Sequence, residues 1–381
     1  MALHRVCGLS ILSGVMKMTG SLQSIQAASK IRIQTCALRS QSIRLSFFKP
    51  GARSYLAASR LVRSQNQRNS PIPLLAVAAF SFFSKLVDNE QEENTESEEQ
   101  IIYLLKKAKL SMMKDEMEEA EVILHQALHM AQQGDSRRAI LYTNDLMANL
   151  ALLRGQLDKS EKLFKATMRY MLEDGVKQDD NAFIEISLKL ASIYAAQKRD
   201  GIAVAGYQFC IMSLEEKIEK ERDLPDDILT AEDKSNTRLL LGLCLDSYGR
   251  YLLDNSHLSL AQNMYEKALK ICREEQGELH PHTLTLMNDL ATVLDAQGHH
   301  DKAFAIVNQA SELAHKTEHP DHHVLLSNMA AILMYQGPEH LANAEQIFKE
   351  ALKKAKEKKD AASVEYIQKR LSELEQRKEG R

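Results

Sequence analysis

The chain has 381 residues, and its 49 basic and 52 acidic side chains give a formal net charge of −3 at pH 7. This near balance hides a division, because residues 1–87 hold twelve Lys and Arg and no acid, which leaves 37 basic against 52 acidic residues in the remainder. A body with this acidic excess is not a general nucleic-acid binder, and its three cysteines, an odd number without a CxxC motif, favour reduced thiols.

Residues 1–70 are typical of a mitochondrial transit peptide. They lack acids, carry regularly spaced Arg and are rich in Ser and small apolar residues. A positive, amphipathic segment is drawn across a membrane whose far side is negative. The alternative is a disordered basic arm that binds nucleic acid, which the even dispersal of charge and the few aromatic residues disfavour. Cleavage is expected between about residues 53 and 70.

Residues 71–87 form the most apolar part of this acid-free stretch. Its core, residues 74–83, contains a single hydroxyl. Ten residues of helix cover about 15 Å and residues 72–87 about 24 Å, whereas the hydrocarbon core of a bilayer is about 30 Å thick. The length favours a marginal span, an interfacial anchor or docking among the helices of a membrane-embedded partner; a helix packed on the soluble domain is the alternative. The docking side chains would be Leu74, Leu75, Val77, Phe80, Phe82 and Phe83. The acidic residues 88–99 predict a disordered linker.

Residues 100–381 are predicted to form an all-α solenoid. Apolar residues recur there at helical spacing, and no stretch shows the alternation of a strand. A small residue is followed four residues later by a larger one and three residues after that by another small or modest one. This triplet occurs six times, as Ala120/Leu124/Ala127, Ser160/Phe164/Thr167, Ala203/Tyr207/Cys210, Ala261/Tyr265/Ala268, Ala303/Val307/Ala310 and Ala344/Phe348/Ala351. Because two helices approach closely where a small side chain faces a large one, the pattern predicts about six helical hairpins.

Several features complete this organisation. Gly155, Gly298 and Gly337 are expected to end first helices, and residues 361–378, with Val364, Ile367, Leu371 and Leu374 at helical spacing, predict a capping helix. The triplets are spaced by 40, 43, 58, 42 and 41 residues. The long interval holds the charged residues 213–227, which form either helix extensions or a protruding loop. Glu–Lys pairs at i,i+4 favour the extension.

No catalytic, cofactor or metal site is predicted. Phosphate-binding loops, nucleophile elbows and metalloprotease motifs are missing from the sequence. His315 and His319 are four residues apart and could share a helical face, but zinc needs three or four ligands and no further ones converge on them. Cys210 occupies a packing position, so a reduced core thiol is expected.

The triplet resembles the core of the tetratricopeptide repeat family, although the consensus Trp is absent and the period is near 42 rather than 34. The longer period and the motif GELHPHTL at residues 277–284 resemble the kinesin-light-chain style of repeat. His319-Pro320 echoes His280-Pro281, and each Pro is expected at the first position of a first helix, where it is tolerated.

Such a solenoid presents its first helices along a concave groove. The repeat register places these polar groove candidates on it: Asp145, Asn149, Glu185, Lys189, Asp246, Arg250, Asn288, Asp289 and Asn328. The resemblance implies that the Asn side chains hydrogen-bond an extended peptide backbone, and the acidic balance favours a neutral or basic ligand segment. Alternatively, several of these residues merely solvate the concave surface.

The leader, the apolar segment, the acidic run and the repeats together resemble a family of mitochondrial tetratricopeptide-repeat proteins. The resemblance implies a non-catalytic adaptor at the inner membrane that associates with respiratory complex III. It further implies a role in assembly and maintenance of that complex, including clearance of fragments of its Rieske iron–sulfur subunit. A second hypothesis is a cytosolic cargo adaptor like the kinesin light chain, and a third is a protease acting on such fragments, for which the sequence offers no nucleophile or metal set.

Overall fold

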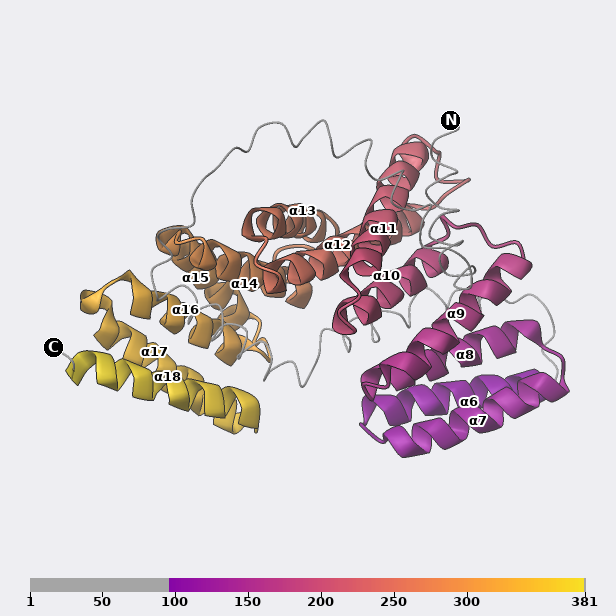
Figure 1. Ribbon diagram of the computed structural model, residues 1–381, viewed down its shortest axis with the longest axis horizontal. Coiled ribbons are helices and arrows are strands. Elements are labelled where there is room, and N and C mark those ends of the chain that lie inside the picture. Colours follow the sequence, from indigo (N-terminus) through magenta and orange to yellow (C-terminus); the bar gives the residue numbers. More distant parts are fainter. Residues whose placement is uncertain (1–95, 380–381) are drawn as a thin grey trace. The chain divides into compact units, whose positions relative to one another are not determined.

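The computed structural model describes residues 96–379. Residues 1–70, the apolar segment 71–87 and most of the acidic run lie outside the described residues, so the predictions made for them are not tested by the structure. The described part contains thirteen α-helices, one short 3-10 helix and no strand (Figure 1). The helices are α6 (Glu96–Met113), α7 (Met117–Gln133), α8 (Arg137–Leu153), α9 (Leu157–Glu173), α10 (Asn181–Ala196), α11 (Asp200–Glu221), α12 (Ala231–Asp254), α13 (Leu258–Gln276), α14 (Pro281–Ala296), α15 (His300–Lys316), α16 (His322–Gln336), η1 (Pro338–His340), α17 (Leu341–Glu357) and α18 (Ala361–Glu379). Within this part of the chain, no helix has the length and apolar character needed to cross a membrane.

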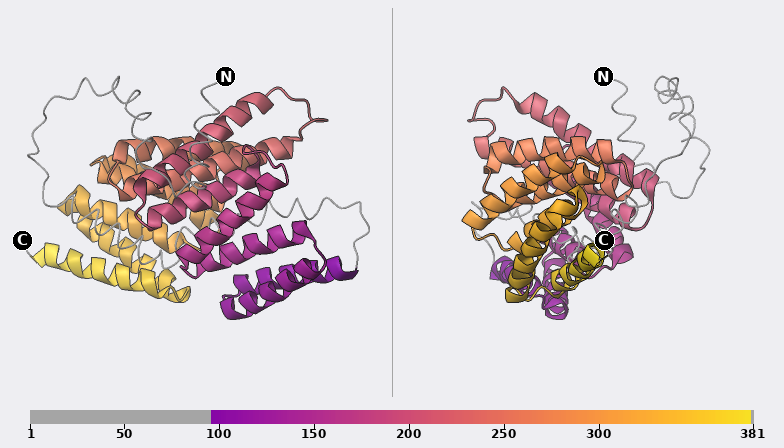
Figure 2. Two further views of the ribbon diagram at one scale, coloured as in Figure 1. Left: turned by 45° about the vertical axis from the view of Figure 1, so that its right-hand side comes forward. Right: turned by 90° about the vertical axis from the view of Figure 1, so that its left-hand side faces the viewer.

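The helices form six hairpins, which pair α6 with α7, α8 with α9, α10 with α11, α12 with α13, α14 with α15 and α16 with α17. Each second helix also packs against the first helix of the next hairpin, and α18 packs on α17 and α16 (Figures 1 and 2). This arrangement confirms the predicted all-α solenoid of six hairpins and a capping helix.

The six triplets are the packing positions of the second helices. They lie on α7, α9, α11, α13, α15 and α17, and no member is more than 3 % exposed. Small residues let the helix axes come close: a Cβ added to Gly206 on α11 would lie 2.9 Å from the Cβ of Ala191 on α10. Such an approach places many carbon atoms at van der Waals distance and buries the large side chain of each triplet.

The three predicted glycines follow the ends of first helices, and of the two predicted N-terminal prolines one begins its helix and the other does not. Gly155 and Gly298 follow α8 and α14 with φ of 69° and 85°, a left-handed conformation that suits glycine, whereas Gly337 has an extended φ of 161°. Pro281 is the first residue of α14, as predicted. Pro320 is not the first residue of α16, because a short turn separates it from the helix start at His322.

The charged insertion extends two helices. At 22 and 24 residues, α11 and α12 are the longest helices among the described residues, and residues 222–230 connect them. Lys220 Nζ lies 2.9 Å from Glu216 Oε1, an i,i+4 pair of the expected kind. Thr230 begins α12 by accepting a hydrogen bond from the Asp233 backbone N–H at 3.1 Å. Residues 213–221 of the charged stretch therefore extend α11, as predicted, while residues 222–227 lie in the connection to α12.

The capping helix is also confirmed. On α18, Ile367 and Leu374 are fully buried, and Val364 and Leu371 pack against the core at its margin. Arg377 donates a hydrogen bond of 3.0 Å to the Met334 carbonyl on α16, which ties the end of α18 to the last hairpin.

Candidate partner-binding site

All nine groove candidates lie on first helices of hairpins. Asp145 and Asn149 are on α8, and the remaining seven follow on α10, α12, α14 and α16. We call this set the polar row. Its members contact one another between neighbouring first helices at three places, each with its own chemistry.

The first contact is a buried charge cluster between α8 and α10. Lys189 Nζ lies 2.8 Å from Glu185 Oε1 and 3.9 Å from Asp145 Oδ1, and these three residues are at most 1 % exposed. Asn149 Nδ2 donates to Asp145 Oδ2 at 2.9 Å. The same ammonium lies 5.3 Å from the centre of the Phe164 ring, a cation–π distance. One ammonium therefore faces two carboxylates without access to water.

The cluster is not fully satisfied. Among the described residues, both carboxylate oxygens of Glu185, Oδ1 of Asp145 and Nζ of Lys189 lack a hydrogen-bond partner of good geometry, so the 2.8 Å contact is an ion pair rather than an aligned hydrogen bond. Burial raises the pKa of Glu185 to about 7, and the charge of Asp145 adds to this while Lys189 opposes it. Burial also raises the pKa of Asp145. The site thus holds Glu185 close to its titration point at neutral pH.

The second contact joins α12 and α14. Arg250 donates two hydrogen bonds to Asp246, at 2.9 and 2.8 Å, and its Nε lies 3.6 Å from Asp289 Oδ2. His282 Nε2 is 3.4 Å from Asp246 Oδ2, and its Nδ1 is 3.5 Å from Cys272 Sγ. The two cations contact Asp246 together, and the arginine does so in the bidentate geometry that it favours.

These contacts shift the pKa values of Asp246 and His282 in opposite directions. Burial works to raise the pKa of Asp246, but Arg250 and then His282 outweigh it and hold that pKa well below its ordinary value. Burial works to lower the pKa of His282, but hydrogen bonds with Asp246 and Cys272 outweigh it and raise the pKa to about 10. His282 is therefore an imidazolium at neutral pH, and it links the start of α14 to α12 and α13.

The third contact is a hydrogen bond from Asn328 Nδ2 on α16 to Asn288 Oδ1 on α14, at 2.8 Å. Both side chains are half-buried. Repeating the same amide at the same register thus joins the fifth hairpin to the sixth.

The polar row is more buried than a solvent-lined groove. Six of its nine members are below 9 % exposed: Asp145, Asn149, Glu185, Lys189, Asp246 and Asp289. Only Arg250, Asn288 and Asn328 are half-buried. The cause is that most of these polar side chains turn toward neighbours within the row, so the six buried members do not solvate the surface. Contact of a partner with the row stays a prediction.

Sequence reasoning missed His282 and Cys272 as members of this region. His282 lies two residues after His280 in the quoted GELHPHTL motif, and a histidine directly after the proline that begins a first helix was the available signal. The His315/His319 pair does not share a helical face, because α15 ends at Lys316 and the His319 ring accepts a hydrogen bond from the Asp321 N–H. Across residues 96–379, no three His, Cys, Asp or Glu side chains are grouped to hold a metal ion.

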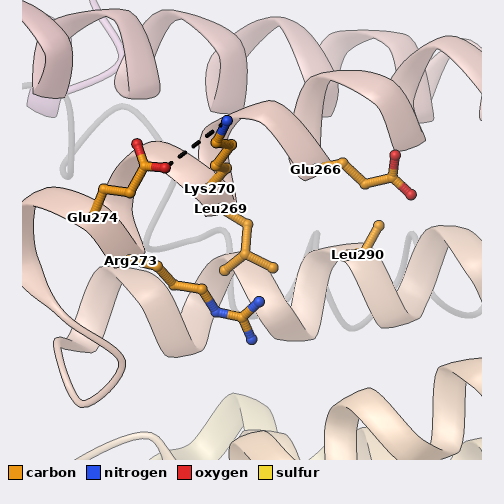
Figure 3. A pocket seen from close by; sticks show the side chains of 6 residues that line it. All are labelled: Glu266, Leu269, Lys270, Arg273, Glu274 and Leu290. Carbon is orange, nitrogen blue, oxygen red and sulfur yellow. Dashed lines mark ion pairs between the residues drawn. The ribbon is translucent and has the colours of Figure 1, made fainter.

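A hollow of about 380 Å³ lies beside α13 and α14. Figure 3 shows its six lining side chains, with Lys270 and Glu274 paired at 3.9 Å on its rim. Only Leu269 and Leu290 offer an apolar floor, and the other four lining residues are charged. Small-molecule sites are mainly apolar with a few convergent polar groups, so this hollow does not resemble one.

Comparisons with known proteins agree with this architecture. The family model described as tetratricopeptide repeat matches residues 243–316, from within α12 to the end of α15. The crystal structure of the apo form of RapI aligns over 81 % of this chain and 79 % of its own, with a TM-score of 0.52 at 14 % identity, which supports the fold alone.

Several relatives extend over most of the sequence, including one from Drosophila melanogaster and one from Homo sapiens. The Drosophila melanogaster protein named tetratricopeptide repeat protein 19 homolog, mitochondrial, is 26 % identical over 299 residues, 78 % of each chain. The Homo sapiens protein named tetratricopeptide repeat protein 19, mitochondrial, is 56 % identical over 315 residues, which cover 80 % of this chain and 82 % of the relative. With this identity across both chains, and with six tetratricopeptide-like hairpins in its structure, the chain belongs to the mitochondrial tetratricopeptide repeat protein 19 family.

Proposed function

We propose that the chain is a non-catalytic adaptor of the mitochondrial inner membrane that associates with respiratory complex III. It supports assembly and maintenance of that complex, including clearance of fragments of the Rieske iron–sulfur subunit. Residues 1–70 act as the transit peptide, and residues 71–87 dock in the bilayer or in the complex. No cofactor, nucleic acid or small-molecule substrate takes part.

The observation that carries this proposal is the row of hairpins itself. Six stacked hairpins carry polar side chains in register on five of their first helices, and helical repeats use such positions to recognise extended protein segments. The mitochondrial names of the relatives and the acid-free leader support the location.

The half-buried end of the polar row offers the contact. The bond between Asn328 and Asn288 uses the side-chain NH2 group of Asn328 and the side-chain carbonyl of Asn288. The carbonyl of Asn328 and the NH2 group of Asn288 can therefore bond to a peptide backbone. Arg250 lies one hairpin earlier and is committed to Asp246 and Asp289. The acidic balance of the row favours a neutral or basic partner segment.

Replacing both Asn288 and Asn328 by Ala tests this contact. Mitochondria that lack the chain would be complemented with the full-length variant, and recovery of complex III subunits and Rieske fragments with the chain would be measured. Loss of the two amides is expected to lower recovery, corresponding to about tenfold weaker affinity. Asn263 is exposed on α13, and Asn263→Ala is the matched control. Equal recovery by the variant and the control would refute the assigned contact.

Deleting residues 72–87 while keeping the leader tests the docking segment. The deleted chain should leave the membrane pellet and lose complex III after import. Unchanged co-sedimentation with both would end the docking role, independently of the result for the two Asn residues.

The alternative hypothesis, a cytosolic cargo adaptor like the kinesin light chain, rests on the repeat style. A reporter fused to residues 1–71 separates the two, since import into mitochondria supports the adaptor proposed here and a cytosolic reporter supports the alternative. The protease hypothesis predicts cleavage of Rieske fragments by the purified chain, whereas we expect the fragments to stay intact.

A further inference from the structure

The first hairpin exposes more large apolar side chains than any other described part of the chain. Tyr103, Leu110 and Met113 on α6 are 64, 50 and 74 % exposed, and Val122 on α7 is 58 % exposed. From residue 280 to residue 379 there is no exposed large apolar side chain, and the last helix, α18, is amphipathic with a polar outer side. Terminal repeats of solenoids normally carry a polar outer face, so the first hairpin departs from the rule.

The exposed side chains of α6 form one stripe. Tyr103 and Leu110 are two turns apart and Met113 is one turn further, opposite the buried Ile101, Leu105 and Met112.

Basic residues flank the stripe. Lys106 and Lys107 are exposed on α6, and Lys114 is exposed directly after its last residue. Residues 100–114 contain four Lys and no acid, and the acids of α6, Glu96, Glu98 and Glu99, are confined to its first turn. Lys107 Nζ lies 3.5 Å from Glu119 Oε1, but both side chains are about half exposed, so this pair is weak and easily exchanged. We call the six exposed residues from Tyr103 to Lys114 the α6 face.

We propose that the α6 face lies on the surface of an anionic lipid bilayer. Lysines beside exposed aromatic and aliphatic side chains match the acyl boundary and charged headgroups of such a surface. The proposal rests on the proposed membrane docking of residues 71–87. Residues 88–95 separate that segment from the start of α6, and eight residues reach at most about 29 Å, so α6 is tethered close to the membrane.

Tryptophan fluorescence tests the contact directly, because the chain contains no Trp. In full-length Tyr103→Trp, the single indole reports the α6 face. In full-length Leu260→Trp, it reports a position on α13 where the native side chain is 54 % exposed, and this variant serves as the control. Each protein is mixed with vesicles of phosphatidylcholine, with or without cardiolipin, and with brominated lipid as a quencher. We expect a blue shift and quenching for Tyr103→Trp with cardiolipin vesicles, and neither change for Leu260→Trp.

A second variant isolates the charge. Lys106→Gln, Lys107→Gln and Lys114→Gln are combined in the Tyr103→Trp chain, where they keep helix propensity and leave the basic leader intact. Each lysine near an anionic surface contributes about fivefold to binding, so the ratio of docked to undocked α6 face should fall on the order of a hundredfold. Quenching of the indole by brominated lipid measures this ratio.

Three outcomes overturn the proposal. Sedimentation of Tyr103→Trp with vesicles, without a change in its fluorescence, removes the lipid contact and leaves the docking of residues 71–87 standing. Equal quenching in the chain with and without the three lysines removes the electrostatic basis. An indole in Tyr103→Trp that is shielded before vesicles are added, and exposed once residues 72–87 are deleted, assigns the α6 face to that segment of the chain. Loss of sedimentation on deletion of residues 72–87 tests the proposed function separately.

Discussion

Glu185→Gln is expected to stabilise the chain, and to do so only above acidic pH. In the native state Glu185 is 1 % exposed and its pKa is about 7, against an ordinary value of 4.5. Between these two values the folded chain keeps a proton that the unfolded chain has lost. The unfolding free energy therefore falls as pH rises through this window.

The size of the effect follows from the same two values. The difference between 4.5 and about 7 corresponds to about 3 kcal/mol, fully developed near pH 8 and absent by about pH 4. Gln fills the same volume without the charge, so the variant escapes this loss. The ion pair with Lys189 does not reverse the sign, because the cost of burying a second carboxylate beside Asp145 exceeds the attraction.

Urea unfolding at pH 4, 6 and 8, followed by far-ultraviolet circular dichroism, measures the difference. Glu121→Gln is the matched control of opposite sign. A hydrogen bond from Lys159 lowers the pKa of Glu121, which is partly exposed, so its loss should cost at most about 1 kcal/mol at pH 8 and nothing at low pH. If Glu185→Gln destabilises the chain at pH 8 as much as at pH 4, the carboxylate is net stabilising and the reasoning fails.

Three further substitutions test the packing and the second charged contact. His282→Gln should lower the unfolding free energy by several kcal/mol at pH 6, and this loss should shrink as pH rises toward about 10. The reason is that the raised pKa of His282 contributes stability that is complete below about pH 6.5 and lost above about pH 10. Thermal melts of the variant and the unmodified chain across this range measure the difference. Gly206→Ala should cost about 1–3 kcal/mol in urea unfolding, since its new Cβ would lie 2.9 Å from Ala191 Cβ. Gly201→Ala, with no neighbour within 4 Å, should instead gain up to about 1 kcal/mol from helix propensity, and equal effects of the two glycine substitutions would contradict the close approach of α10 and α11.

The hairpins could be predicted from the sequence because the same packing pattern recurs in every hairpin. Ala203, Tyr207 and Cys210 are recognisable as a triplet since the same sizes recur five more times at the same offsets, and the structure buries every copy. A period of this kind averages over many residues, so the absent Trp and the irregular interval did not obscure it.

The burial of the polar row was not readable in the same way. The sequence does not show whether a Lys or Glu at a first-helix position faces water or an oppositely charged neighbour. Lys189, for example, contacts Asp145, which lies 44 residues earlier in the chain. Burial of an ion pair depends on the distance between helix axes, which the repeat pattern leaves open. The start of α16 was also not predicted correctly. The likeness of His319-Pro320 to His280-Pro281 suggested a helix start at Pro320, but a short turn places it at His322.

The three cysteines of the solenoid make its local opening measurable. Cys210, Cys244 and Cys272 are free thiols with 0 % exposure, and they lie on the consecutive helices α11, α12 and α13. In a stack of hairpins, stability is shared between nearest neighbours, so these central helices open only when adjacent interfaces part. The alkylation rate of each thiol therefore reports how often its own interface separates, and the middle of the stack can be followed without any introduced label.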